Sequence, residues 1–451
     1  MTKSYPIVPI LRGRNFGYSI YVQFKDADVH ADSQRIENLV PERSFRSICE
    51  SFASMCKGKS SLIKAVIFGI IVGITRILVA FLMDFMSKST LTSGPFVAIY
   101  RGNLKIFEHW DSGWFIQIAQ HGYFSIQSTA FYPGYPLLIR LAHVLVGANT
   151  SINTVAVLVD WSAFIASIIA LYIATSLVTS EIGGAVVAVF YAFAPASVFS
   201  VSAYSESTTV LLCALSAILI VKKHPFAGAA IAGLASLTGS VGAVFGLSIA
   251  LGYLLRERKF FRAVLIGLLS ETGSFLYAGY LWSRFNNPLE NLVAQKNWFR
   301  HAVVPFTGLY ANIVNIVTGR IHFSVLPLPA TNKNMVTAWV IDDLTALIVV
   351  FIVIAYLFFA IRERSLLGIP LEWVIFAVVS TIVINSTVIT TFGTFVSTEA
   401  LARLLGEVFA IYPIGYVVLK RLWILAGPIA IGLFSLCIMG QLLIVLNFWF
   451  T

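Results

Sequence analysis

Residues 65–86 read AVIFGIIVGITRILVAFLMDFM, an apolar run in which Arg76 and Asp84 are the only charged side chains. A helix that crosses a bilayer needs about 20 predominantly apolar residues, so this stretch is long enough to span a membrane. Three lysines precede it within residues 57–64. Because cationic residues are retained on the cytoplasmic side, this cluster predicts that the N-terminus lies inside.

The composition of the whole chain extends this prediction. Of 451 residues, 58% are apolar and only 12% are charged, and the mean hydropathy is +0.85. About a quarter of the residues of a soluble protein are charged, so a soluble enzyme, a disordered chain and a collagen-like fibre are excluded. The 31 Lys and Arg against 21 Asp and Glu are typical of cationic loops that face anionic lipids. They form no dense basic run, so nucleic acid is not an expected partner.

The hydropathy pattern predicts an all-α, polytopic bundle of about 10–12 transmembrane helices. Apolar segments follow the first span at about 133–148, 154–178, 183–200, 206–221, 226–255, 262–283, 337–361, 371–393, 404–419 and 423–447. The segment 226–255 is too long for one comfortable span and contains Gly239 and Gly242, so we predict a hairpin of two short spans.

The polar segments divide the chain into a tail and two long loops. Residues 1–64 predict a cytoplasmic N-terminal extension, and 65–450 the membrane domain. Segments 87–132 and 284–336 are aromatic and amphipathic, which favours short helices at the outer membrane interface.

The side of the membrane on which residues 201–207 lie depends on the preceding spans. If 133–148, 154–178 and 183–200 all cross, 201–207 lie inside. If 133–148 crosses only partly, 201–207 share the outer face with the first loop. We favour the second arrangement because it brings two acidic motifs together.

The first loop holds the most informative motif, Trp110-Asp111-Ser112-Gly113-Trp114-Phe115. A carboxylate between two tryptophans at an interface loses water, and it can then act as a general base. An alternative is that Asp111 only caps a short interfacial helix.

Three motifs in order resemble the PIG-V family, which comprises the second mannosyltransferase of glycosylphosphatidylinositol (GPI) anchor synthesis and its prokaryotic relatives, within the GT-C superfamily. The resemblance covers about 65–450. The motifs are Trp-Asp-x-x-Trp-Phe with the later Phe131-Tyr132-Pro133-Gly134-Tyr135-Pro136, then Tyr204-Ser205-Glu206, then Pro288-Leu289 with Ala294-Gln295 and Trp298-Phe299-Arg300.

The resemblance implies a GT-C-like fold and transfer of mannose, or another hexose, from a dolichyl or polyprenyl phosphate to a lipid-linked acceptor such as a GPI precursor. It implies that Asp111 is the general base and that Glu206 binds the acceptor or orients Asp111. The alternative for Glu206 is a helix cap. The active site would face the endoplasmic reticulum lumen in a eukaryote, or the outside of the cell membrane in a prokaryote.

Other residues are candidates for holding the substrates. The leaving phosphate needs cations, which Arg can supply as a planar fork and Lys as a point charge. The cation candidates are Arg300, Arg403 and Lys296, of which Lys296 is better explained by contact with lipid headgroups. The candidates for contact with the sugar or the lipids are Trp110, Trp114, Tyr204, Gln295 and Trp298. No metal cluster is evident, so no cofactor is expected, while a small membrane partner subunit is possible.

One position departs from the family pattern. An Arg is expected after Leu237-Thr238, but Gly239 follows. Either another cation replaces it or the acceptor differs. Two further hypotheses stay open, namely a secondary transporter or lipid flippase, and a non-catalytic subunit of a glycosyltransferase. Two long aromatic outer loops favour the transferase.

Overall fold

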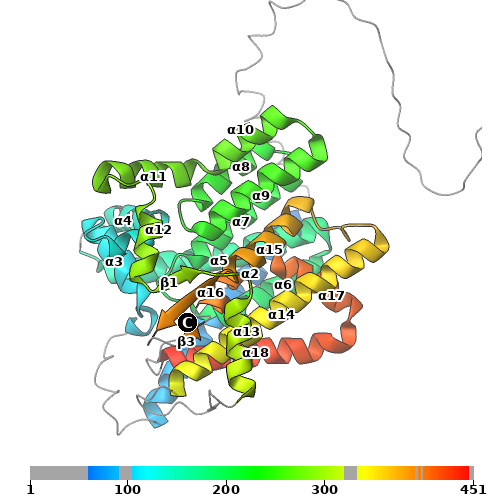
Figure 1. Cartoon of the computed structure of the whole chain (residues 1–451). Coiled ribbons are helices and arrows are strands. Elements are labelled where there is room, and N and C mark those ends of the chain that lie inside the picture. The colour runs from blue at the N-terminus through cyan, green and yellow to red at the C-terminus, as the bar shows by residue number, and fades with distance from the viewer. Residues whose placement is uncertain are drawn as a thin grey trace, which may run out of the picture. The chain divides into compact units, whose positions relative to one another are not determined.

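The computed structural model describes residues 59–90, 104–147, 149–318, 333–391, 395–397 and 400–445. These residues belong to one compact unit, 51–451, and Figure 1 shows them as a bundle of helices. The predicted cytoplasmic extension, 1–64, lies almost wholly outside the described residues.

Most described residues are helical, as predicted. The α-helices are α2 (Lys59–Thr90), α3 (Asp111–His121), α4 (Gly134–Val146), α5 (Ile152–Val178), α6 (Glu181–Ala192), α7 (Glu206–Val221), α8 (Pro225–Ala235), α9 (Ser240–Glu257), α10 (Phe260–Ser270), α11 (Thr272–Phe285), α12 (Glu290–Asn297), α13 (Thr307–Val317), α14 (Lys333–Glu363), α15 (Leu371–Ile384), α16 (Leu401–Gly406), α17 (Ile411–Arg421) and α18 (Trp423–Val445). Three short 3₁₀ helices join them, η3 (Lys105–Phe107), η4 (Gln127–Ala130) and η5 (Pro195–Val198).

Several helices are long and apolar enough to cross a membrane. Within the described ranges five pass this test singly, namely α2, α5, α9, α14 and α18, and α10 with α11 passes as a pair bent by 54°. Five more apolar helices are shorter, with 10–17 residues each. The polytopic helical prediction is confirmed, but 10–12 spans are reached only if these shorter helices are counted.

The predicted hairpin in 226–255 is present as α8 and α9. The two helices pack closely at their junction, because a Cβ on Gly242 would lie 2.1 Å from the carbonyl oxygen of Ala235. Only glycine leaves room for this approach of two backbones. The turn contacts the end of the first loop, where the Gly134 amide donates to the Leu237 carbonyl at 2.8 Å.

Two predicted spans are wrong in their extent. The segment 371–393 is helical only to Ile384, and Thr387–Thr391 form strand β2, since a run of β-branched residues favours a strand. The segment 404–419 is divided between α16 and α17. Pro413 is the third residue of α17, in the first turn, where the missing N–H of a proline costs no helical hydrogen bond.

A small sheet also departs from the all-helical prediction. Strand β1 (Arg300–Ala302) pairs with β2 (Thr387–Thr391), which pairs with β3 (Phe395–Ser397), and both pairings are antiparallel. The sheet joins the second outer loop to the segment after α15. Each strand is only three to five residues long, so the hydropathy pattern carried no sign of it.

The centre of the bundle is formed by α5 and α7, which pack against each other, while α2 and α6 pack on α5. The segment before α7 meets the first loop, because the Ala203 amide donates to the Phe107 carbonyl at 2.8 Å. Helix α4 has only 13 residues and packs on α3 as well as α5. Residues 201–207 therefore lie beside the first loop, while the partial crossing of 133–148 stays a prediction.

Candidate active site

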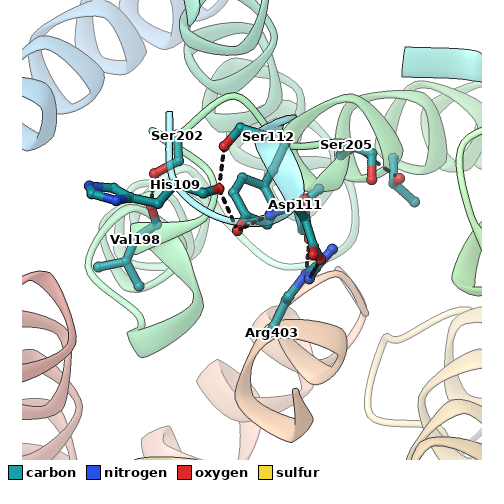
Figure 2. A network of polar contacts seen from close by, with 10 residues as sticks. His109, Asp111, Ser112, Val198, Ser202, Ser205 and Arg403 are labelled. Atoms are coloured by element: carbon teal, nitrogen blue, oxygen red, sulfur yellow. Dashed lines mark hydrogen bonds and ion pairs between the residues drawn. The ribbon is translucent and has the colours of Figure 1, made fainter. Parts of the chain in front are cut away.

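One arginine joins the two acidic motifs of the sequence. Arg403 Nη1 donates to Asp111 Oδ2 at 2.5 Å, and Arg403 Nε donates to Glu206 Oε1. These residues are separated by 292 and 197 positions in the chain. Figure 2 shows Arg403 and Asp111 pointing toward each other from different elements. Helix packing therefore assembles a carboxylate–guanidinium–carboxylate group from α3, α7 and α16.

The three side chains differ in access to solvent. The side chains of Asp111 and Arg403 are each 16% exposed, whereas that of Glu206 is 3% exposed. A substrate can thus reach Asp111 and Arg403 directly. Glu206 lies behind them, and its Oε2 is buried without a hydrogen-bond partner in the part of the chain that the structure describes.

Local backbone geometry presents Asp111 at the start of α3. The preceding residue, Trp110, has a φ of 42°, which is unfavourable for a residue with a large side chain. Such backbone strain concentrates at functional sites. The Asp111 amide donates to the Tyr204 hydroxyl at 3.3 Å, while that hydroxyl donates to the His109 carbonyl at 3.1 Å. Tyr204 therefore holds the loop that carries Asp111.

Aromatic rings and charges fix Arg403. Its guanidinium carbon lies 4.8 Å from the ring centroid of Tyr204 and 5.7 Å from that of Phe199, which are cation–π distances. Burial lowers the pKa of Arg403, but the carboxylates of Glu206 and Asp111 raise it further, so its pKa lies well above its usual value. The guanidinium stays charged.

A third carboxyl group, Glu407, was not predicted. It is 5% exposed and lies near Glu206 and Arg403. Glu407 lies four positions after Arg403 in an apolar segment, and the rule that charges in such segments are functional candidates would have found it.

Gly239, which stands where the family pattern has an Arg, lies close to the carboxyl group of Glu407. A Cβ on Gly239 would lie 3.8 Å from Glu407 Oε2 and 4.0 Å from Thr209 Oγ1. A side chain at 239 would therefore start beside the acidic residues. In this chain the cation at those residues comes from α16 as Arg403.

Trp114 and Trp298 form an aromatic cluster with Phe131 that adjoins the acidic group. Trp114 contacts Trp298 with centroids 5.4 Å apart and stacks on Phe131 at 5.6 Å. Phe115 contacts Phe131 at 5.3 Å and Tyr204 at 6.2 Å, which connects the cluster to the ring beneath Arg403. The two long loops of the sequence thus meet, since Trp298 belongs to the second.

The remaining candidates lie in the second loop around Trp298. Gln295 is half-buried and Lys296 is exposed, both on α12. Arg300 opens β1 and is half-buried. These three residues are close to Trp298 in the sequence. By contrast, direct contacts join Asp111, Glu206, Tyr204 and Arg403.

Known proteins are similar to a part of this chain that contains several of these residues. Residues 65–282, just under half of the chain, match the family model Mannosyltransferase (PIG-V). This segment is similar to the PIG-V mannosyltransferase family. It contains Asp111, Tyr204 and Glu206, while Arg403 lies beyond it.

Among curated proteins, GPI mannosyltransferase pigv-1 of Caenorhabditis elegans is 28% identical over 205 residues. The match covers 41% of this chain and 27% of that relative, so the chain spans about a quarter of the length of the PIG-V protein that it matches.

Two solved structures of an Archaeoglobus fulgidus oligosaccharyltransferase are also similar. A crystal structure with zinc and sulfate gives a TM-score of 0.47 at 12% identity, covering 83% of this chain and 53% of that one. The archaeal enzyme AglB with an inhibitory peptide and a dolichol-phosphate gives 0.43 at 11% identity, covering 84% and 55%.

Proposed function

We propose that this multi-pass membrane protein is a glycosyltransferase that moves mannose, or another hexose, from a dolichyl or polyprenyl phosphate to a lipid-linked acceptor such as a GPI precursor. The observation that carries the proposal is the ion-paired group of Asp111, Arg403 and Glu206. It supplies a carboxylate and a cation at one accessible place, which are the two charges that this transfer requires. The PIG-V segment supports the same reaction class.

In this proposal Asp111 is the general base. Its carboxylate takes the proton of an acceptor hydroxyl as that oxygen attacks the anomeric carbon of the donor sugar. The new glycosidic bond forms while the bond between the anomeric carbon and the phosphate oxygen breaks, and the polyprenyl phosphate leaves with the electron pair. Glu206, which is buried behind Arg403, pairs with the same guanidinium and orients Asp111 through it.

Arg403 has two roles in this reaction. In the free protein it pairs with Asp111 and occupies Oδ2 of that carboxylate. A donor phosphate competes for the same N–H groups, since a guanidinium binds phosphate with bidentate geometry. Donor binding would then release Asp111 to act on the acceptor, and Arg403 would stabilise the charge that develops on the leaving phosphate.

The distribution of charge supports an outward-facing site. Helix α7 begins at Glu206, in the site, and is followed at its other end by Lys222 and Lys223. Sixteen helical residues extend about 24 Å, so the lysines lie far from the site. Because Lys and Arg mark the cytoplasmic side, the site faces the lumen or the cell exterior.

The deciding experiment measures transfer of radiolabelled mannose from dolichyl-phosphate mannose into lipids, in membranes with and without the protein. We expect labelled lipid only with the protein. A panel of other polyprenyl-phosphate sugars follows if mannose gives no label. Absence of transfer from every donor, with labelled lipid instead moving across the membrane, would contradict the transferase and support a flippase.

We expect transfer to be independent of metal ions. The described residues contain no group of three or more His, Cys, Asp or Glu that could hold a metal, and Arg403 occupies the carboxylates of the site. Initial rates measured in EDTA should therefore equal those without it. A loss of activity in EDTA that Mn²⁺ restores would contradict this prediction.

Trp298 is expected to support the sugar, because aromatic faces pack on hexoses. Trp298→Ala removes its contacts with Trp114 and Phe131 and should raise the KM for the donor by up to about tenfold, with a smaller effect on kcat. The matched control is Trp282→Ala, which removes a 64% exposed tryptophan of α11. Equal KM values for both variants would remove Trp298 from the substrate site.

A further inference from the structure

The helix that carries Arg403 is short and cannot cap itself. Helix α16 has six residues, and its N-cap residue, Ala400, has a left-handed φ of 71° and no side-chain acceptor. An N-cap side chain normally accepts a hydrogen bond from the amide of the second or third helical residue. In α16 these residues are Ala402 and Arg403.

A residue of another helix supplies this acceptor. Asp342 Oδ1 of α14 accepts the hydrogen bond of the Ala402 amide at 2.7 Å, and Asp342 is fully buried. A negative charge at a helix N-terminus also interacts favourably with the helix dipole. The hydrogen bond is therefore made by the residue just before Arg403. Its acceptor, Asp342, lies 60 positions before Ala402 in the chain.

We propose that Asp342 is a positioning residue, which holds the first turn of α16 so that Arg403 reaches both Asp111 and Glu206. Its bearing on catalysis rests on the proposed function, whereas its hold on α16 does not. Asp342 makes its contact with the backbone of α16, and its role is to accept a hydrogen bond and not to exchange a proton.

The two aspartates of α14 provide a matched pair. Asp343 is also buried, but its Oδ1 accepts from Asn312 Nδ2 of α13 at 3.3 Å. Asp343→Asn preserves an acceptor oxygen for Asn312 and keeps Asp342, so transfer should change less than about twofold. Asp342→Ala removes the cap and should lower kcat/KM for the donor by about fivefold and at most about 30-fold, the factor by which a lost cap weakens a helix.

The conservative variant separates positioning from proton transfer. Asp342→Asn keeps an oxygen that can accept the Ala402 N–H, so it should recover most of the activity that Asp342→Ala loses. An Asp342→Asn variant as inactive as Asp342→Ala, with α16 still ordered, would overturn the positioning role.

A second readout does not depend on catalysis. Amide hydrogen exchange of peptides covering 400–407, measured on the full-length protein, should be faster in Asp342→Ala than in wild type, Asp342→Asn or Asp343→Asn. Unchanged exchange in Asp342→Ala would overturn the proposal. If wild type showed no transfer at all, the proposed function would fail, and the exchange result would still decide whether Asp342 holds α16.

Discussion

Asp111→Asn should lower the rate of sugar transfer by about 10²–10⁴-fold, the range that a general base contributes. Asn cannot take the proton of the acceptor hydroxyl, so the attacking oxygen stays a weak nucleophile. The variant should remain folded, because Asp111 is partly exposed and the Asn side-chain oxygen can still accept the hydrogen bond of Arg403 Nη1. Initial rates of mannose transfer in purified protein test this expectation.

The matched control for Asp111 lies three residues earlier in the same loop. Glu108 Oε2 accepts a hydrogen bond from Asn153 Nδ2 at 2.6 Å, and Glu108→Gln preserves an oxygen for it. This variant should keep near-normal transfer. Near-normal transfer in Asp111→Asn as well would show that Asp111 is not the base.

Arg403→Ala should affect both stability and transfer. It leaves the Glu206 carboxylate, whose side chain is only 3% exposed, without its cation. Removal of one partner from a buried ion pair costs about 3–5 kcal/mol, because the other charge remains buried and uncompensated. Transfer should be lost, since the leaving phosphate also loses its cation. Arg403→Lys should retain part of both, because a single ammonium cannot reproduce the fork that joins two carboxylates.

Two variants test whether the loss of stability in Arg403→Ala arises from the buried charge of Glu206. Arg421→Ala breaks an ion pair with Glu363 whose side chains are 31% and 43% exposed, and it should lower stability far less than Arg403→Ala, because solvent screens exposed charges. The double variant Arg403→Ala, Glu206→Gln removes the uncompensated charge and should recover stability without recovering transfer. Thermal unfolding in detergent provides the comparison. If Arg403→Ala were as stable as wild type, the ion pair with Glu206 would not form in the protein.

Much of the helix pattern followed from the sequence alone. The predicted span 206–221 has the bounds of α7, and 154–178 differs from α5 only at its first residues. The hairpin within 226–255 was also correct, because two glycines interrupt a long apolar run. Hydropathy along a chain and the conformational freedom of glycine are local properties, and a sequence displays them directly.

The breaks in 371–393 and 404–419 were not predictable in the same way. Both segments are apolar enough to be a span, yet β2 pairs with β1 from the second loop, and α16 is held by Asp342. In each case the backbone hydrogen bonds are satisfied by a partner far along the chain. Hydropathy gives no information about such partners, because it reports solvent preference and not pairing.

The residues of the candidate site also fall into two groups, those that sequence motifs indicate and those that only the tertiary structure brings together. Sequence motifs made Asp111, Glu206 and Tyr204 candidates, and Arg403 was one of three candidate cations. Only the tertiary structure selected Arg403 and revealed Glu407 beside it, because these contacts depend on which faces of α3, α7 and α16 meet. A charged side chain in an apolar segment predicts that a partner must exist, since an unpaired buried charge is too costly. Which partner it finds is decided by the packing of the helices.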